Sequence, residues 1–213
     1  MALCYIAKIL LFAHIGLQGA AATNETTTPM TSGTSAAGTS GTGVLYEYGN
    51  ATDRLTARGD GIVSVNPTVK FPFGGNTYSS FDLYNRGLLY FNGFVIAPFS
   101  ANIYNAVSGN IYYRQSADPS LLANATQDIN TYFPGLGFSA QWVFIATWDK
   151  VPQNGGNASQ VNTFQVVLIT DGTISFALFN YADIQWTNGA QDRFAHHYWV
   201  QWLIGKTEPK FIS

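Results

Sequence analysis

The stretch "QWVFIATWDKVP", Gln141 to Pro152, decides the fold. Successive side chains of an extended chain point to opposite faces, so Trp142, Phe144 and Trp148 share one face. The residues between them are also mostly apolar. A strand that is apolar on both faces is typical of the middle of a sheet that is covered on both sides. Asp149 follows where such a strand would leave the core, so a packed β-structure is favoured over the floor of a catalytic site.

Two further long strands follow in the sequence. They are "VNTFQVVLITDG" (Val161–Gly172) and "TISFALFNYADIQW" (Thr173–Trp186). The pair Asp171-Gly172 between alternating apolar runs is a strong hairpin signal. The segment Gln153–Ser159 is a longer, Gly- and Asn-rich turn. These short connections predict an antiparallel meander of three strands.

One helix is predicted upstream of the meander. In "ADPSLLANATQDINTYFPG", Asp118 is a favourable N-cap and Pro119 stands at the first helical position. Pro134-Gly135 ends the pattern. Five apolar residues recur at helical spacing: Leu121, Leu122, Ala125, Ile129 and Phe133.

Shorter strands are predicted before the helix, and with them the fold class. They lie in Pro67–Gly75, in Phe81–Ala97 around a turn at Asn85-Arg86-Gly87, and in Gly109–Gln115. Aromatic residues make up 15% of the chain and charged residues only 10%, a composition that favours β-structure. We therefore expect a mainly β protein, an antiparallel β-sandwich-like domain with one α-helix. The second sheet should cover one face of the long strands and the helix part of the other.

The ends of the chain have a different composition. Residues 1–22 combine the single charge Lys8 with a short apolar run and small residues at the end, which predicts a secretory signal peptide cleaved after Ala22. Residues 23–43 form a Thr/Ser/Gly-rich linker suited to O-glycosylation. The domain then spans 44–186, and 187–213 is a divergent C-terminal tail. We expect no membrane span, and a secreted, extracellular protein.

Enzymatic and nucleic-acid functions find little support in the sequence. The formal charge is −2 and no basic stripe exists, so no nucleic-acid partner is expected. The only cysteine, Cys4, lies in the signal, which excludes a Cys nucleophile or a Cys-based zinc site in the processed chain. The adjacent His196 and His197 lack a ligand constellation. Four residues could line a calcium site, but their spacing matches no calcium loop and turn roles are favoured: Asp53, Asp60, Asp171 and Asn157. We expect no enzyme, no metal and no cofactor.

Two kinds of surface motif stand out. The triplet Arg58-Gly59-Asp60 is read by integrins in many matrix proteins, and a guanidinium and a carboxylate separated by a flexible Gly can span a cation-dependent groove. The alternative is a chance triplet in an ordinary loop. Four N-x-S/T sequons predict N-glycosylation: Asn24, Asn50, Asn124 and Asn157.

Several motifs together resemble the nidogen-type extracellular domain (NIDO), and its alpha-tectorin-like members in particular. They are "FPFGG" near Phe71, "RGLLYFN" at Arg86, "LLANATQDI" at Leu121, "ATWDKVP" at Ala146 and the long run that begins at Val161. They cover about residues 45–186 in the expected order. The chain departs from the pattern after Trp186, where "FAHHYWVQWLIG" either replaces a closing strand or stays exposed. Poor order is favoured there, and a truncated isoform or an imperfect gene model would account for it.

The resemblance implies a non-enzymatic domain of the extracellular matrix. Its expected role is cell–matrix adhesion or matrix assembly, with matrix glycoproteins or cell-surface receptors as partners. The family brings no catalytic residues, and Trp148-Asp149-Lys150 and Asn180-Tyr181 are expected to be structural. The alternative is a carbohydrate-binding, lectin-like module, because aromatic-rich sandwiches often bind sugars. An exposed row of aromatic side chains on one sheet face would favour that alternative, and buried aromatic side chains would favour a structural domain.

Overall fold

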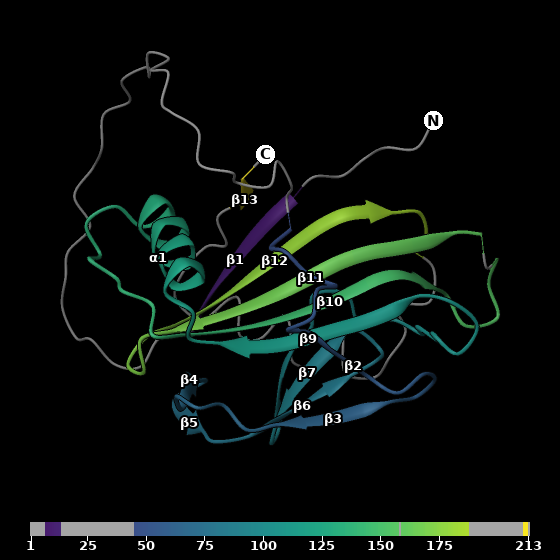
Figure 1. The fold of residues 1–213 in the computed structure, drawn as a ribbon, viewed down its shortest axis with the longest axis horizontal. Helices are drawn as coiled ribbons and strands as arrows, with labels where there is room; N and C mark the ends of the chain where they lie inside the picture. Colours follow the sequence, from purple (N-terminus) through teal and green to yellow (C-terminus); the bar gives the residue numbers. More distant parts are fainter. Residues whose placement is uncertain (1–6, 14–44, 158, 188–210, 213) are drawn as a thin grey trace, which may run out of the picture.

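The structure, a computed structural model, describes residues 7–13, 45–157, 159–187 and 211–212, with only the backbone for the first and last of these ranges. Two antiparallel sheets face each other, and one helix lies on the far side of the larger sheet (Figure 1). This arrangement confirms the predicted β-sandwich-like fold with one helix. In the described residues, no helix has the length and apolar character needed to cross a membrane.

The larger sheet has the order β13-β1-β12-β11-β10-β9-β2. Its middle is the predicted meander, and Trp142 pairs with Thr170 at one end of the β10–β11 ladder. A bulge interrupts this ladder between Trp148 and Val151, where Lys150 takes a φ of 52°. The strands are β1 (Ala7–Ala13), β2 (Arg54–Leu55), β9 (Asn110–Ser116), β10 (Trp142–Pro152), β11 (Val161–Thr170), β12 (Ser175–Ile184) and β13 (Phe211–Ile212).

The smaller sheet has the order β3-β6-β7-β8, and a separate hairpin β4–β5 lies beside it. The turn predicted at Asn85-Arg86-Gly87 joins β6 to β7, and the Gly87 N–H donates to the carbonyl of Tyr84 over 3.2 Å. Gly74 and Gly75, both with positive φ, form the turn of the hairpin. The strands are β3 (Ile62–Val65), β4 (Phe71–Phe73), β5 (Asn76–Tyr78), β6 (Phe81–Tyr84), β7 (Leu88–Phe91) and β8 (Phe94–Ile96).

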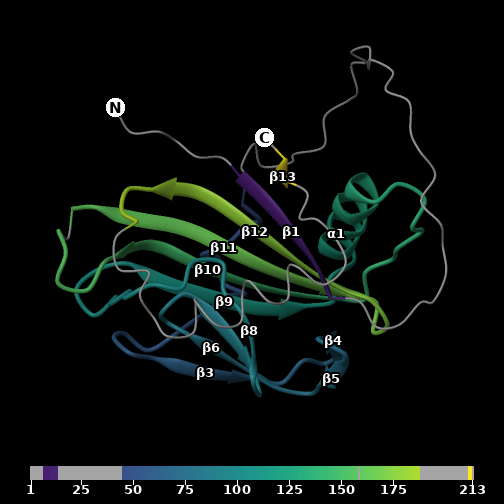
Figure 2. The same ribbon diagram turned by 180° about the vertical axis from the view of Figure 1, so that it is seen from behind.

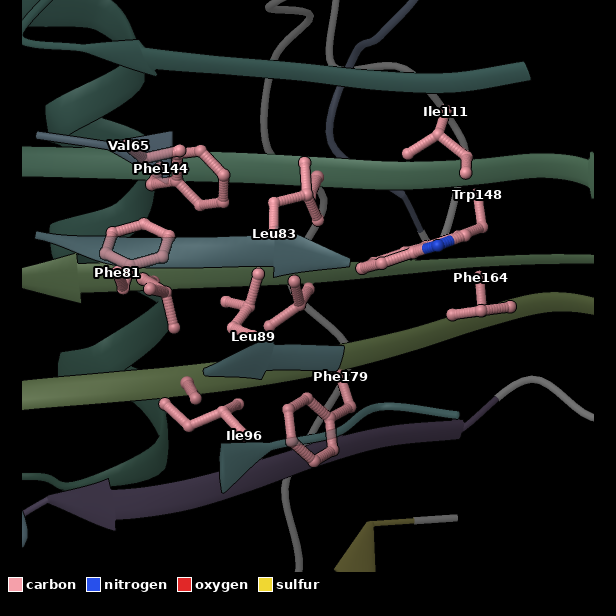
Figure 3. Close-up of a cluster of buried hydrophobic side chains, with 14 of the residues drawn as sticks. Val65, Phe81, Leu83, Leu89, Ile96, Ile111, Phe144, Trp148, Phe164 and Phe179 are labelled. Carbon is pink, nitrogen blue, oxygen red and sulfur yellow. The ribbon is translucent and has the colours of Figure 1, made fainter. Parts of the chain in front are cut away.

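The main core fills the space between the two sheets (Figure 3). Trp148 and Phe164 stack there on neighbouring strands, with ring centroids 4.9 Å apart and planes at 11°. Phe81 of the smaller sheet meets Phe144 of the larger sheet edge to face at 5.0 Å. The face of β10 that carries Trp142, Phe144 and Trp148 therefore packs against the smaller sheet, in agreement with the predicted alternation.

The other face of the larger sheet is covered by α1 (Pro119–Tyr132). The Asp118 carboxylate caps the helix by accepting from the N–H groups of Ser120 and Leu121, as predicted. Ala125 and Ile129 are fully buried in a second apolar cluster against β10, β11 and β12. The prediction that the single helix covers part of the second face of the long strands is confirmed.

Strand β1 lies along β12, as Figures 1 and 2 both show, and the two-residue strand β13 pairs with its other side at Lys8 and Ile9. Its pairing runs from Ala7 opposite Tyr181 to Ala13 opposite Ser175. β1 falls inside residues 1–22, the predicted signal peptide. The linker 23–43 and most of the tail lie outside the described residues, and their assignments stay predictions.

Candidate functional site

The outward face of the smaller sheet carries the candidate site. The strand period of two turns Phe81 and Leu83 of β6 into the core and Tyr84 outward. Across the sheet, Tyr84 pairs with Ile62 on one side and with Leu88 on the other. The register therefore places apolar and aromatic side chains side by side on a face that α1 and the larger sheet do not cover.

A cleft of about 500 Å³ opens on this face. We call it the outer cleft; it is lined by Asp60, Gly61, Ile62, Tyr84, Arg86, Leu88, Tyr90 and Val95. The rings of Tyr84 and Tyr90 meet edge to face with centroids 6.4 Å apart. Ile62 leaves 55% of its surface exposed. Such a concave, mainly apolar surface with a few polar groups is typical of binding sites.

Charged groups mark one end of the outer cleft. Arg86 donates to the Asp60 carboxylate over 3.3 Å, and both side chains are largely exposed, by 41% and 64%. An exposed ion pair of this kind adds little to stability, about 0–1 kcal/mol. Asp60 can therefore exchange this contact for a contact with a ligand at modest cost.

The structure holds the triplet Arg58-Gly59-Asp60 firmly at this end. Gly59 is buried with a φ of 87° and donates its N–H to the Asn105 side chain over 3.0 Å. The Arg58 guanidinium donates to the Asn105 carbonyl and to the Asn110 side chain over 3.1 and 3.2 Å. The Gly that the sequence suggests is flexible takes a defined conformation here, with a positive φ and a hydrogen-bonded amide. Of the three residues, Asp60 lines the cleft, where it pairs with Arg86.

A buried chain of contacts connects this loop to the core. The Asn85 side chain donates to the carbonyls of Ala57 and Gly59, each over 2.8 Å. The Asn85 carbonyl in turn accepts from the Trp148 indole N–H over 2.9 Å. Trp148, expected to be structural, therefore packs the core and also fixes the backbone that leads to the outer cleft.

The other expected structural positions also make internal contacts. The Asp149 carboxylate accepts from the Tyr48 hydroxyl over 3.1 Å. Asn180 donates to the Gln165 side chain over 3.1 Å, and the Tyr181 hydroxyl donates to the Pro98 carbonyl over 2.6 Å. These groups lock strands and loops together and offer no pair of nucleophile and base.

The residues considered for calcium lie in separate turns. Asp53 pairs with Arg114 over 2.6 Å. The Asp171 side chain caps the β11–β12 turn by accepting from the N–H groups of Thr173 and Ile174, each over 2.7 Å. Within residues 45–157 and 159–187, where side chains are described, His, Cys, Asp and Glu form no group able to hold a metal ion. The histidine pair 196–197 lies outside the described residues.

Three of the four predicted glycosylation sites are described, and all three asparagines are exposed. Asn50 accepts from the backbone and hydroxyl of Thr52 over 2.9 and 2.6 Å. Asn157 makes the same pair of contacts with Ser159, over 3.0 and 2.8 Å. Asn124 lies on an outward position of α1. Asn24 lies outside the described residues.

Sequence reasoning found Asp60 but missed the cleft itself. The clue was in "FDLY" and "LLYF", where Tyr84 and Tyr90 fall on the alternate positions opposite to the core residues. Burial raises the pKa of Tyr84, and the nearby Asp82 adds to this rise. The phenol therefore stays neutral at physiological pH and can both donate and accept hydrogen bonds.

Comparisons with known proteins match the chain to one family. Residues 60–201 match the nidogen-like domain. Alpha-tectorin of Gallus gallus is 42% identical over 140 residues, 57% of this chain and 7% of that protein. Alpha-tectorin of Mus musculus is 39% identical over 165 residues, which cover 68% of this chain and 8% of that protein. Nidogen-1 of Rattus norvegicus is 32% identical over 95 residues, which cover 41% of this chain and 29% of that protein.

No solved structure gives a significant match. The chain thus spans less than a tenth of the alpha-tectorins it matches. The family match covers both sheets from the Asp60 loop onward, the helix and the outer cleft, and it continues to residue 201, into the stretch that the sequence set apart as divergent. On this match, over most of the domain, the chain belongs to the nidogen-like domain family.

Proposed function

We propose that the protein is a non-enzymatic domain of the extracellular matrix that acts in cell–matrix adhesion or matrix assembly. Membership of a family that includes nidogens and alpha-tectorins supports an extracellular matrix role. The described polar groups serve the fold, since they cap turns, pair across strands and anchor loops. What remains available for a partner is surface, and the outer cleft is a concave part of it.

The single observation that carries this proposal is the form of the outer cleft. It combines exposed apolar surface at Ile62, two tyrosine rings and an exposed ion pair. Protein-binding surfaces are enriched in tyrosine and arginine and gain most of their affinity from a small central patch. The proposed partner is a matrix glycoprotein or a cell-surface receptor whose contact segment lies across Tyr84 and Tyr90.

A matched pair of variants tests this surface. Ile62 in the outer cleft and Leu55 on β2 expose 55% and 57% of their surfaces. Ile62→Asp and Leu55→Asp therefore introduce the same charge at equal exposure. We expect cells and matrix extracts to bind the immobilised Leu55→Asp protein like wild type and to lose most binding to Ile62→Asp. Equal binding to both variants would rule out the outer cleft.

The Arg58-Gly59-Asp60 triplet as an integrin contact stays a narrower proposal. Asp60 is free to leave Arg86, whereas Arg58 would have to break its bonds to Asn105 and Asn110. Asp60→Glu moves the carboxylate by one methylene at constant charge. If integrins use the triplet, attachment falls in this variant and in EDTA. Attachment that survives both treatments leaves adhesion to the apolar part of the cleft.

Carbohydrate binding remains a second candidate because Tyr84 and Tyr90 offer ring faces for stacking. Among the described residues, many other aromatic side chains are buried in the core, including Trp142, Phe144 and Phe164, which favours the structural domain. A glycan array separates the two functions. Binding to a defined saccharide that is lost in Tyr90→Ala would establish the lectin-like function, and a blank array with intact cell attachment would reject it.

A further inference from the structure

The side of β12 that pairs with β1 is the place where we look for a different partner strand in the processed protein. β12 is buried on both faces, with Phe176 and Leu178 on one side and Phe179 on the other. Its outer neighbour over seven residues is β1 (Figure 2). Cleavage of the predicted signal after Ala22 would remove β1. The backbone of Ser175–Tyr181 would then form a long apolar edge, which proteins normally cover.

A buried polar atom at this edge also lacks a partner. The Asn180 side chain is fully buried, and its amide nitrogen donates to Gln165 over 3.1 Å. Its oxygen Oδ1 accepts no hydrogen bond from any residue whose side chain the structure describes. An unsatisfied buried acceptor costs about 1–3 kcal/mol, so native proteins rarely leave one. Asn180 lies opposite Lys8 of β1, which places the missing donor on whichever strand replaces β1.

We propose that residues 200–206 of the chain take the place of β1 in the processed protein. They would pair antiparallel with β12, with Gln201 opposite Asn180. A strand that follows β12 through a connection returns antiparallel beside it, which extends the meander by one strand. The connection contains Asn188-Gly189, a favoured turn pair. The family match, which reaches residue 201, includes the first part of this segment in the domain.

In the proposed register, the side chains of residues 201–204 match their neighbours on both faces of the sheet. Gln201 and Leu203 would point to the side of α1, beside Asn180 and Leu178. The side-chain N–H of Gln201, the one amide in the segment, would donate to the free Oδ1. Trp202 and Ile204 would face the main core next to Phe179 and Ala177. From sequence alone, poor order was favoured for this tail; the edge of β12 and the unpartnered oxygen favour a strand.

Engineered cysteines test the pairing without competing thiols, because the only native cysteine, Cys4, lies in the signal. The full chain is expressed with its own signal in secretory cells. The pair Ala177→Cys and Ile204→Cys stands directly opposite in the proposed register, within reach of a disulfide. The control pair Ala177→Cys and Leu203→Cys points to opposite faces. We expect both thiols to be lost in the first protein and retained in the second.

Two measurements on the secreted wild-type protein complete the test. N-terminal sequencing should begin after residue 22, and amides of residues 200–204 should exchange at least a hundredfold more slowly than in an unstructured peptide. A mature chain that keeps residues 7–13, or rapid exchange in a folded domain, would overturn the proposal. A disulfide-linked dimer of the first variant would instead assign the edge to a second copy and reject pairing within one chain.

Discussion

Replacement of Trp148 is expected to weaken the domain and loosen the outer cleft together. The side chain is fully buried in the main core, where it stacks on Phe164. Its indole N–H donates to the carbonyl of Asn85, whose side chain holds Gly59. Trp148→Ala removes the stacked ring and the donor, whereas Trp148→Phe removes the donor and keeps a smaller aromatic ring.

The two variants should differ in magnitude. Truncation of a buried Trp to Ala costs about 3–5 kcal/mol, because the removed atoms lose their burial and a cavity remains. Loss of the donor alone leaves the buried Asn85 carbonyl unsatisfied, at about 1–3 kcal/mol. Domains of this kind are stable by about 5–15 kcal/mol in total. Trp148→Ala therefore removes a large share of the free energy of unfolding, and Trp148→Phe a smaller one.

Urea unfolding followed by circular dichroism measures both effects. With a slope of about 2 kcal/mol per molar urea, the Ala variant should lower the midpoint by about 2 M and the Phe variant by about 0.5–1.5 M. Hydrogen exchange at Gly59 and Asp60 should accelerate in both, because the Asn85 backbone loses its anchor. An Ala variant within 1 kcal/mol of wild type would refute the packing argument, and unchanged exchange in Trp148→Phe would refute the connection to the cleft.

Three further predictions concern the turn after β6, the response to alkali and the glycans. Gly87→Ala should be strongly destabilised in thermal unfolding, because Gly87 has a φ of 85° and an added methyl group would collide with the Phe99 carbonyl; Gly93→Ala, which meets no neighbouring atom, should be milder. Burial, and then Asp149, raise the pKa of Tyr48 from 10.0 to about 12. The Tyr48 hydroxyl therefore loses its proton at lower pH in the unfolded chain than in the folded one. The free energy of unfolding should thus be constant with respect to this group below pH 10 and fall as the pH rises toward 12. Tyr48→Phe should reduce this fall, and an unchanged pH profile would contradict it. Protein secreted from animal cells should carry glycans at positions 50, 124 and 157; Asn157→Gln and Ser159→Ala should each remove one glycan mass, and a mass equal to wild type would show an unused site.

Local patterns in the sequence determined the elements and their faces. The double-sided apolar stretch Gln141–Pro152 predicted a central strand, and Asp171-Gly172 predicted the β11–β12 hairpin. Asp118 and Pro119 fixed the start of α1 to the residue. These features depend on side-chain alternation, turn chemistry and capping, which act over a few neighbouring residues. The residues that specify them are adjacent in the chain, so the sequence suffices.

Only the tertiary structure decided which distant residues meet. Asp60 and Arg86 lie 26 positions apart and are joined at one end of the outer cleft, while Asn85 and Asn105 both hydrogen-bond Gly59 from two other loops. The left-handed backbone of Gly59 and its buried amide could not be read from the triplet, which looked like a flexible exposed motif. The outer cleft likewise depends on the register of β3, β6, β7 and β8, because a slip of one residue would turn its tyrosines into the core. That register follows from packing the opposite faces of these strands against β10 and β11, an interaction between segments that no local pattern encodes.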